Sequence, residues 1–222
     1  MSHVVHPYAH RLGILRDWKS RWFGARKEYT KALKGDVLVR EYLEKKLRGF
    51  YVADIEIERN QNSLRVIIKT ARAGLVIGRG GEGSVKLRDE ILGILKKNKL
   101  SIPPEVKVDI EEIKYPETNA SLVGQMIAEG LEKRMPFRRV MKQTIEKVMA
   151  SRDVKGAKIA LSGRLGGADM SRKEHLKKGN IPLQTFRADI DFAREQAHMS
   201  YGKIGIKVWI YKGEIFNKDE VK

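Results

Sequence analysis

Four glycines lie within six residues between a strand pattern and a helix pattern, and this stretch restricts the possible folds most. The stretch is Gly78-Arg79-Gly80-Gly81-Glu82-Gly83; it follows an apolar run over residues 64–70 and precedes a helical pattern over residues 82–97. Glycine lets the backbone turn sharply and lets an anion approach backbone N–H groups without hindrance. Arg79 adds a fixed positive charge at the tip. The stretch therefore predicts a site for a phosphate-bearing ligand.

Two kinds of nucleotide-binding loop fit these residues poorly. The spacing matches the dinucleotide fingerprint GxGxxG, but that motif needs a tight strand–turn–helix and an acidic residue at the end of the next parallel strand. Here residues 71–77 separate the strand from the loop, and the next strand pattern, after Pro103-Pro104, has its acidic residue, Glu105, at the beginning. The mononucleotide loop GxxxxGK[ST] is excluded because Ser84-Val85 follow the last glycine.

The third kind of loop is the GxxG of a KH domain, formed by Gly78, Arg79, Gly80 and Gly81. In a KH domain this loop joins two helices and clamps about four nucleotides, here beside Ile77. The expected elements are helix, strand, strand, short helix, helix and strand over residues 36–49, 52–58, 64–70, 71–77, 82–97 and 106–113. Asp36 is the expected N-cap of the first helix. This order is that of a type II KH domain.

Pro116 begins a second unit. Apolar residues at helical spacing predict one helix that ends near Met135-Pro136 and another over residues 137–149. Three strand patterns follow, over residues 157–162, 183–191 and 204–211. This order predicts a second α+β domain of two helices and a three-stranded sheet. The expected division of the chain is a basic aromatic arm (1–35), a type II KH domain (36–115), a C-terminal α+β domain (116–214) and a polar tail (215–222).

The chain is strongly basic, as a nucleic-acid-binding protein is expected to be. Its 45 Lys and Arg and 28 Asp and Glu residues give a net charge of +17. The excess lies on the flanks: the net charge is +6 over residues 1–35 (8 basic, 2 acidic), +2 over 36–113 (15 and 13) and +9 over 114–222 (22 and 13). In the arm, the cations expected to meet RNA phosphates are Arg11, Arg16, Lys19 and Arg21.

Several other classes of function lack the residues they need. The chain has no cysteine, which excludes disulfides, thiolate zinc sites and a cysteine nucleophile. His3, His6 and His10 have no further ligand at a metal-binding spacing. No apolar run approaches the roughly 20 residues that span a bilayer, and no secretory signal opens the chain. We therefore expect no catalytic residue, metal, cofactor, small-molecule substrate or membrane partner.

Further specific segments occur in one order along the chain: Arg11-Leu12-Gly13-Ile14, Trp18 to Trp22, Thr70-Ala71-Arg72, Val76 to Gly81, Phe137 to Lys142, Ser162 to Ala168, Arg187 to Asp191, Tyr201-Gly202 and Lys207 to Glu214. With them the chain resembles, from Val5 to Glu214, a bacterial small-subunit ribosomal protein, the third in the conventional numbering. The resemblance implies binding to rRNA in the head of the subunit, beside the entrance of the mRNA channel, and a cytoplasmic, ribosome-bound location. Its implied neighbours are the tenth and fourteenth small-subunit proteins, with the fourth and fifth nearby.

The resemblance also implies roles for individual basic residues. Those that line the mRNA entrance and assist unwinding of structured mRNA map onto Arg138, Arg139 and Lys142, which Lys133 and Arg134 join. On a helical wheel with Phe137 at zero, Arg138, Lys142 and Arg139 fall near about 100°, 140° and 200°, away from the centre of the apolar face. The rRNA-binding set adds Arg72 and the glycine-rich loop residues Arg164, Gly166 and Gly167.

The expected mechanism is electrostatic: a single strand passes fixed cations that hold its phosphates without reading its bases. A second function remains open at this point. The chain would then be a free KH-type regulator or the RNA-binding module of an RNA-processing enzyme.

Overall fold

The computed structural model describes residues 5–60, 62–100 and 103–216, except for the side chains of Arg26 and Lys27. The chain forms two compact units. One is Trp18–Lys114, and the other combines the chain before Trp18 with the chain after Lys114. The segment expected to form a single arm over residues 1–35 is therefore divided between the two units.

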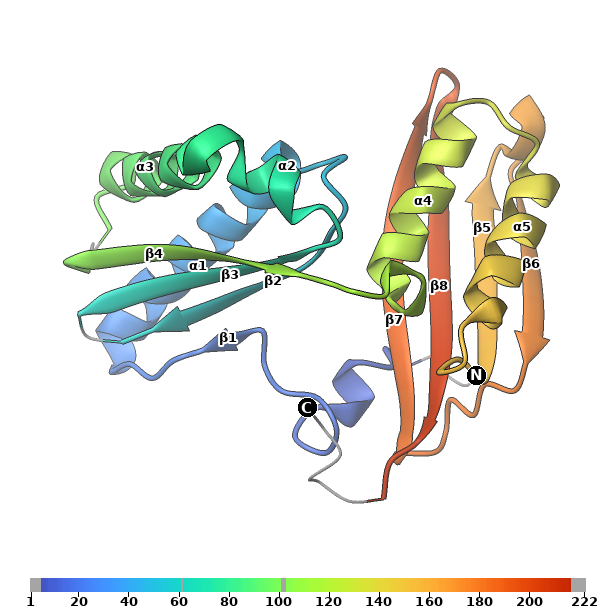
Figure 1. Ribbon diagram of the computed structural model, residues 1–222, viewed down its shortest axis with the longest axis horizontal. Helices are drawn as coiled ribbons and strands as arrows, with labels where there is room; N and C mark the ends of the chain where they lie inside the picture. The colour runs from blue at the N-terminus through green and yellow to red at the C-terminus, as the bar shows by residue number, and fades with distance from the viewer. Residues whose placement is uncertain (1–4, 61, 101–102, 217–222) are drawn as a thin grey trace. The chain divides into compact units, whose positions relative to one another are not determined.

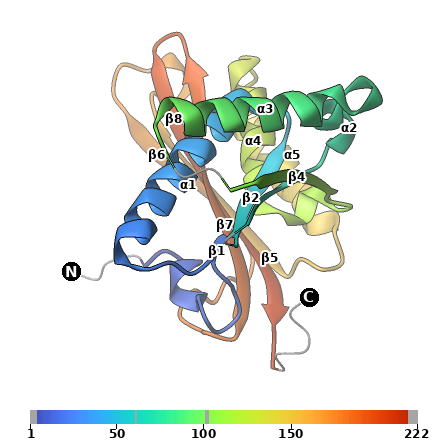
Figure 2. The same cartoon turned by 90° about the vertical axis from the view of Figure 1, so that its left-hand side faces the viewer.

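The first unit has the element order of a type II KH domain, as predicted. Its elements are β1 (Ser20–Arg21), α1 (Arg26–Lys46), β2 (Val52–Arg59), β3 (Ser63–Thr70), α2 (Ala73–Ile77), the 3-10 turn η2 (Arg79–Gly81), α3 (Glu82–Lys97) and β4 (Glu105–Glu112). The sheet has the order β1-β2-β3-β4, with β2 and β3 antiparallel and β3 and β4 parallel. The three helices lie on one face of this sheet (Figures 1 and 2). An antiparallel pair at its centre is incompatible with a doubly wound dinucleotide-binding sheet.

The prediction that Asp36 caps the first helix is wrong, because α1 begins at Arg26. Asp36 lies inside the helix and is only 4% exposed. Its carboxylate accepts hydrogen bonds from Trp22 Nε1 (2.6 Å) and from Arg59 Nη2 (2.7 Å). The carboxylate therefore joins the N-terminal chain and β2 to α1. The first turns of α1 escaped prediction because they are rich in charged residues and carry no regular apolar stripe.

The second unit is a sheet with two helices on one face (Figure 1). Its elements are the 3-10 turns η1 (Ala9–Arg11), η3 (Pro116–Thr118) and η4 (Leu165–Gly167), the helices α4 (Ala120–Glu132) and α5 (Phe137–Ala150), and the strands β5 (Gly156–Gly163), β6 (Arg172–Gly179), β7 (Ala188–Met199) and β8 (Gly202–Glu214). The strand order is β6-β5-β8-β7, with all neighbours antiparallel.

The sheet thus has four strands, and the predicted three-stranded sheet is corrected. The missed strand, β6, lies at the edge and is exposed along most of its length. Its sequence, Arg-Lys-Glu-His-Leu-Lys-Lys-Gly, has no apolar alternation, so it resembled a basic connection. The strand expected over residues 183–191 is shifted: β7 begins at Ala188 and continues to Met199.

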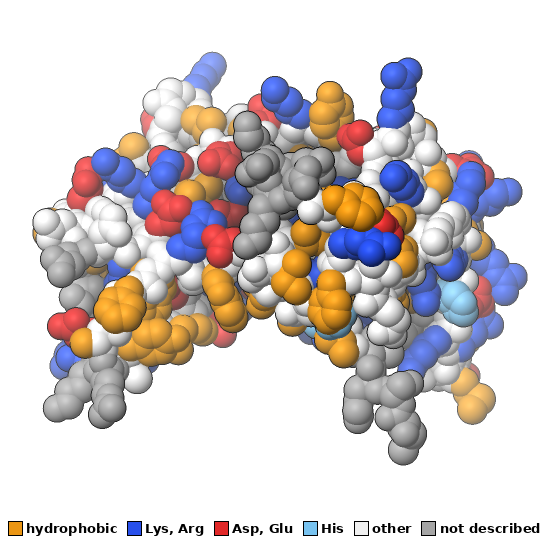
Figure 3. Space-filling model, turned by 90° about the horizontal axis from the view of Figure 1, so that it is seen from below, with side chains coloured by type: hydrophobic (Ala, Val, Ile, Leu, Met, Phe, Trp, Pro, Cys, Tyr) orange, Lys and Arg blue, Asp and Glu red, His pale blue; other side chains and the backbone are white. Residues whose placement is uncertain are grey.

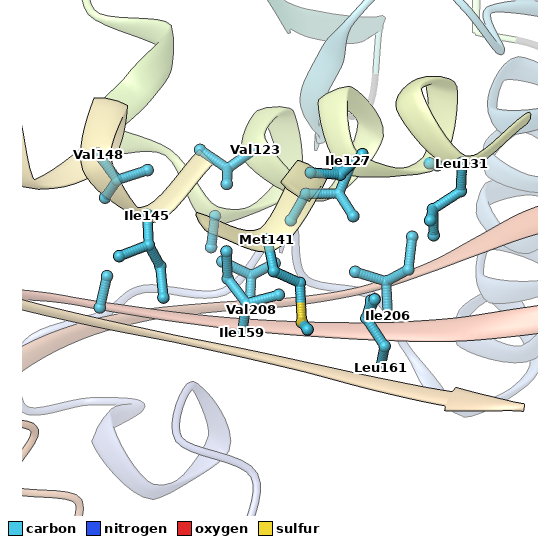
Figure 4. Packing of buried hydrophobic residues seen from close by; sticks show 14 of the residues in the cluster. Val123, Ile127, Leu131, Met141, Ile145, Val148, Ile159, Leu161, Ile206 and Val208 are labelled. Carbon is cyan, nitrogen blue, oxygen red and sulfur yellow. The ribbon is translucent and has the colours of Figure 1, made fainter. Parts of the chain in front are cut away.

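The main core of this unit lies between the helices and the sheet (Figure 4). Apolar residues of α4 and α5 point toward alternate residues of β5 and β8: Val123, Ile127, Leu131, Met141, Ile145 and Val148 from the helices, and Ile159, Leu161, Ile206 and Val208 from the strands. Trp209 and Tyr211 of β8 pack into a smaller cluster with Ile190 on the opposite face of the sheet. β8 is therefore buried on both faces over residues 208–211.

A buried arginine attaches the N-terminal segment to this unit. Arg11 is fully buried, and its guanidinium donates hydrogen bonds only to backbone carbonyl oxygens. Nε donates to Ala188 (2.6 Å), Nη1 to Pro7 (3.0 Å), and Nη2 to Leu183 (3.1 Å) and Thr185 (2.9 Å). Burial lowers the pKa of this guanidinium, but an arginine remains charged at neutral pH. The four bonds satisfy carbonyl oxygens of the N-terminal segment, of the loop before β7 and of the first residue of β7.

We predict that Arg11→Lys lowers the free energy of unfolding of this unit by about 3 kcal/mol. A single ammonium group cannot reach carbonyls arranged around a planar guanidinium, so some of them stay buried without a donor. Urea unfolding followed by circular dichroism measures the change. Arg187→Lys is the control, because Arg187 is 57% exposed and its ion pair with Glu214 is worth less than about 1 kcal/mol. Equal losses in the two variants would contradict the structural role of Arg11.

Candidate nucleic-acid interface

The GxxG loop joins α2 to α3, as the KH interpretation predicts. Gly78, Gly80 and Gly81 have φ angles of 72°, 63° and 84°, a region that side chains beyond glycine rarely adopt. No described heavy atom lies within 4 Å of a Cβ built on Gly80 or Gly81. These two glycines therefore serve the backbone turn and leave open space in front of the loop.

Gly83 has a different role. It lies in the first turn of α3, where a Cβ would be 2.4 Å from the carbonyl oxygen of Val76 and 2.7 Å from that of Ile77. This glycine permits the start of α3 to contact the end of α2. The apparent GxGxxG spacing thus arises from a packing glycine that follows a KH loop.

The surface beside the loop is both apolar and basic. Leu75, Ile77 and Val85 are 56%, 37% and 47% exposed, and Arg79 is also exposed. Arg72 lies with its guanidinium carbon 4.4 Å from the centre of the Tyr51 ring. Apolar side chains next to a cation and a helix N-terminus suit the bases and phosphates of a single strand.

The cations predicted in the N-terminal arm are mostly engaged within the protein. The prediction that Arg11 binds RNA is corrected, because complete burial leaves its guanidinium no surface for a phosphate. Arg16 pairs with Asp189 at 2.6 Å, and both side chains are largely covered. These two arginines stabilise the fold of the second unit.

Lys19 and Arg21 make comparable contacts in the KH unit. Lys19 pairs with Asp54, and Arg21 bridges Glu56 (2.8 Å) and Glu58 (2.7 Å). Burial raises the pKa of Glu56, but hydrogen bonds from Lys69 and Arg21 outweigh this effect and lower the pKa overall. The carboxylate therefore stays ionised, and the strand β1 is held to β2 by charge as well as by backbone pairing.

The second glycine-rich loop is a compact turn. Gly166 and Gly167 have φ angles of 70° and 81°. Arg164 donates to the carbonyl oxygen of Ala168 (2.9 Å) and to Asp169 (2.9 Å). The guanidinium is held in place, and it remains partly exposed at the surface.

A basic cluster covers the end of α4 and the start of α5. Its members, all exposed, are Lys133, Arg134, Arg138, Arg139 and Lys142. Lys133 pairs with Glu129, and Arg138 pairs with Glu174 of β6 at 3.2 Å. The hydrogen bonds between Arg138 and Glu174 raise the pKa of Arg138 and lower the pKa of Glu174. The remaining three cations form no ion pair with any residue that the structure describes.

Arg134 has a backbone conformation that usually belongs to glycine. Its φ is 60°, and it follows the last turn of α4. The N–H of Arg134 donates to the carbonyl of Leu131 and that of Met135 to the carbonyl of Gly130, which is the hydrogen-bond pattern of a Schellman motif. A cation thus stands where glycine would be less strained.

Sequence reasoning missed the basic residues of β6, which lie beside this cluster. Arg172 and Arg138 both contact Glu174, and both guanidinium carbons lie over the Phe137 ring, at 5.5 and 5.6 Å from its centre. Lys177 and Lys178 follow on the same strand. The run of basic residues was visible in the sequence, but only the strand pairing places it next to α5. Figure 3 shows Lys and Arg side chains gathered at the right-hand edge, where β6 lies.

Two of the histidines considered as metal ligands contact aromatic rings instead. His6 packs edge-on against Phe192, and His10 stacks on Phe186. His3 lies outside the described residues. Within the described ranges, no three His, Cys, Asp or Glu side chains are grouped so that they could hold a metal ion. None of the described helices is long and apolar enough to span a bilayer.

The KH fold with an open GxxG loop, together with an exposed basic cluster on a second α+β unit, defines an RNA-binding protein. The model of the KH domain family matches residues 38–118, and that of the family "Ribosomal protein S3, C-terminal domain" matches residues 127–210. One match falls mainly in each unit.

Curated relatives extend the match to nearly the whole chain. The chain is 48% identical to small ribosomal subunit protein uS3 of Caldicellulosiruptor bescii over 97% of this chain and 94% of that protein. It is 44% identical to uS3 of Clostridium tetani, over 100% and 98% of the two chains, and 49% identical to uS3 of Endomicrobium trichonymphae, over 98% and 90%. The chain therefore belongs to the uS3 family of small ribosomal subunit proteins, which are structural proteins of the ribosome and not enzymes.

We predict that Gly83→Ala destabilises the KH unit by about 2 kcal/mol, since the added methyl group overlaps two carbonyl oxygens. Gly93→Ala, in the middle of the same helix, is the matched control. No described atom lies within 4 Å of its Cβ, and alanine favours a helix, so this variant gains about 0.5–1 kcal/mol. Thermal unfolding distinguishes the two, and a stability gain in both would contradict the packing role of Gly83.

We predict that Arg134→Gly raises the stability of the second unit by about 1 kcal/mol while weakening its binding to RNA. Removal of one phosphate contact should reduce the salt dependence of single-strand binding by about 0.7 in a log–log plot. Thermal unfolding and fluorescence anisotropy with a short single-stranded RNA measure both effects.

Lys99→Gly is the control for this prediction, because Lys99 also has a positive φ (51°) just after a helix, α3. The Lys99→Gly variant should gain similar stability. The salt dependence of its RNA binding should stay unchanged, because the α4–α5 cluster is intact. An unchanged salt dependence in Arg134→Gly would contradict a phosphate contact by Arg134.

Proposed function

We propose that this chain binds rRNA in the head of the small subunit and lines the entrance of the mRNA channel, where its basic residues contact incoming mRNA. The observation that carries the proposal is the exposed cluster on α4 and α5. Arg134, Arg139 and Lys142 have no ion-pair partner among the described residues, and the helix that holds two of them rests on a fully packed core. Unpaired cations on a rigid helix suit a polyanion better than they suit solvent.

The proposed mechanism uses charge and position only. The guanidinium and ammonium groups hold phosphates of a single strand, and such contacts are independent of base sequence. A strand held at the entrance is kept from re-pairing with its complement. The work that opens a hairpin comes from translocation of the ribosome, and the cluster supplies the surface against which the strand is drawn.

Other surfaces are assigned to rRNA. The candidates are the GxxG loop with Arg72, Ile77 and Arg79, and the turn with Arg164, Gly166 and Gly167. Exposed apolar side chains and cations beside an open loop support the first, and a partly exposed guanidinium supports the second. Neighbouring proteins are proposed to be the tenth and fourteenth of the small subunit, with the fourth and fifth near the entrance. A chain without cysteine suits a ribosome in the reducing cytoplasm.

A free KH-type regulator or a module of an RNA-processing enzyme is the alternative. It would use the GxxG loop alone, so it gives no role to the second basic cluster. Sedimentation of small subunits after a high-salt wash separates the two. A chain that enters the free pool while other head proteins stay bound would contradict the ribosomal proposal.

We predict that Arg138→Ala/Arg139→Ala/Lys142→Ala leaves subunit assembly intact and slows translation of messages with a stable hairpin. The expected slowing is about tenfold on hairpin messages relative to unstructured ones, because three phosphate contacts are lost. Single-ribosome or bulk elongation rates on paired messages, which differ only in the hairpin, measure the effect.

Lys96→Ala/Lys97→Ala/Lys99→Ala is the control, since it removes three exposed cations from the end of α3 and changes the net charge equally. It should leave the ratio of the two rates unchanged. Equal rates on hairpin messages for the first variant and the unaltered chain would contradict the role given to α5.

A further inference from the structure

A groove runs between α5 and the edge strand β6, with a volume of about 430 Å³. Ten residues line it: Arg138, Met141, Lys142, Ile145 and Glu146 from α5, and Glu174, His175, Leu176, Lys177 and Lys178 from β6. The groove shares Arg138 and Lys142 with the basic cluster. It is therefore open beside the surface proposed to meet mRNA.

The pairing of β6 explains why this groove exists. Glu174 and Leu176 lie opposite Leu161 and Ile159 of β5, which are buried beneath the helices. Opposite residues of paired strands share a face, so Glu174 and Leu176 face the helix side too. The helices cover β5 but leave the edge strand exposed, and Leu176 retains 36% of its accessible surface.

The floor of the groove is apolar and its rim is basic. Met141 and Ile145 are only 4% and 2% exposed, so they present the edge of the main core. Arg138, Lys142 and Lys178 lie along the rim, whereas Lys177 is paired with Lys158 and faces away from the helices; Glu146 and Glu174 complete the charged lining. One of the two, Glu174, is already neutralised by Arg138 and Arg172, both at 3.2 Å. A ligand with a flat apolar face and negative charge outside the groove fits this arrangement.

We propose that the groove takes one unstacked nucleobase of single-stranded RNA, while the cations at its rim hold the adjoining phosphates. The proposal rests on the proposed function, since Arg138 and Lys142 serve both. Single-strand recognition commonly places splayed bases on apolar side chains or against guanidinium planes. The volume lies within the range of roughly 300–1,000 Å³ typical of small-molecule sites, which is ample for one base.

The charge of β6 favours RNA over a protein strand as the occupant. Five of the eight residues of β6 are charged: Arg172, Lys173, Glu174, Lys177 and Lys178. A lysine-rich edge disfavours the addition of another strand. Arg172 and Lys178, which lie on the helix side of β6, attract the phosphate backbone of RNA. An acidic peptide with an apolar anchor is the competing occupant, and the experiment below separates it.

The test uses small subunits reconstituted with the full chain and messengers that carry one 4-thiouridine at successive positions downstream of the start codon. Irradiation joins the thiolated base to the residues it touches, and mass spectrometry locates them. We expect a crosslink to residues 174–178 that peaks at one messenger position. Leu176→Ala should lower its yield about fivefold, because the base loses one wall of its site. Leu33→Ala, at a leucine of α1 that is 43% exposed, should leave the yield unchanged.

Three results would overturn the proposal. Crosslinks to α5 without any to residues 174–178 would leave the proposed function standing and remove the base from the groove. A yield unaffected by Leu176→Ala would mean that bases pass the groove without entering it. Loss of a ribosomal protein from subunits with Leu176→Ala would assign the groove to a protein segment. By contrast, failure of the proposed function would appear as absence of crosslinks to α5 and β6 alike.

Discussion

The excess of cations over carboxylates constrains this structure more than any single contact does. Forty-five lysines and arginines face 28 carboxylates, so internal pairing cannot neutralise them all. Near the N-terminus, Arg16, Lys19 and Arg21 pair with carboxylates of the sheets and help to fix the fold. On α5, Arg139 and Lys142 have no such partner among the described residues. Because unpaired like charges repel, this cluster lowers the stability of the folded chain. A polyanion bound to the cluster would offset that loss.

Arg11 is stabilised in a second way: backbone carbonyl oxygens, and not a carboxylate, accept the hydrogen bonds of its buried guanidinium. Its bonds hold the N-terminal segment to the chain at the start of β7. A small core lies on the second face of the sheet, where Trp209 and Tyr211 of β8 pack with Ile190 of β7. α5 packs on β5 and β6, and its apolar residues join the main core between the helices and the sheet. This core keeps the side chains on the outer face of α5 in fixed positions, as a preorganised contact surface requires.

Periodic segments were predictable from the sequence, whereas segments defined by distant partners were not. The helix over residues 82–97 and the start of the helix at Phe137 agree with the structure because a regular apolar stripe marks them. The charged beginning of α1 and the strand β6 carry no such stripe. Arg11 looked like a phosphate ligand because nothing local reveals the carbonyls of Leu183 and Thr185 that surround it. For the candidate site, the residue types were predictable, but the groove depended on the pairing of β6 with β5.

Local sequence rules fail in both units, since Tyr51 and Lys99 of the KH unit have a positive φ without being glycine, as Arg134 does. The GxxG loop obeys them, since glycine occupies each of its positive-φ positions. Around α5, by contrast, an arginine has the left-handed conformation of a helix terminus, a strand lacks apolar alternation, and Leu176 stays exposed on the side that should be covered. Natural sequences tolerate such conflicts chiefly where function requires them. The conflicts beside Arg138, Arg139 and Lys142 agree with the proposal that this surface contacts mRNA.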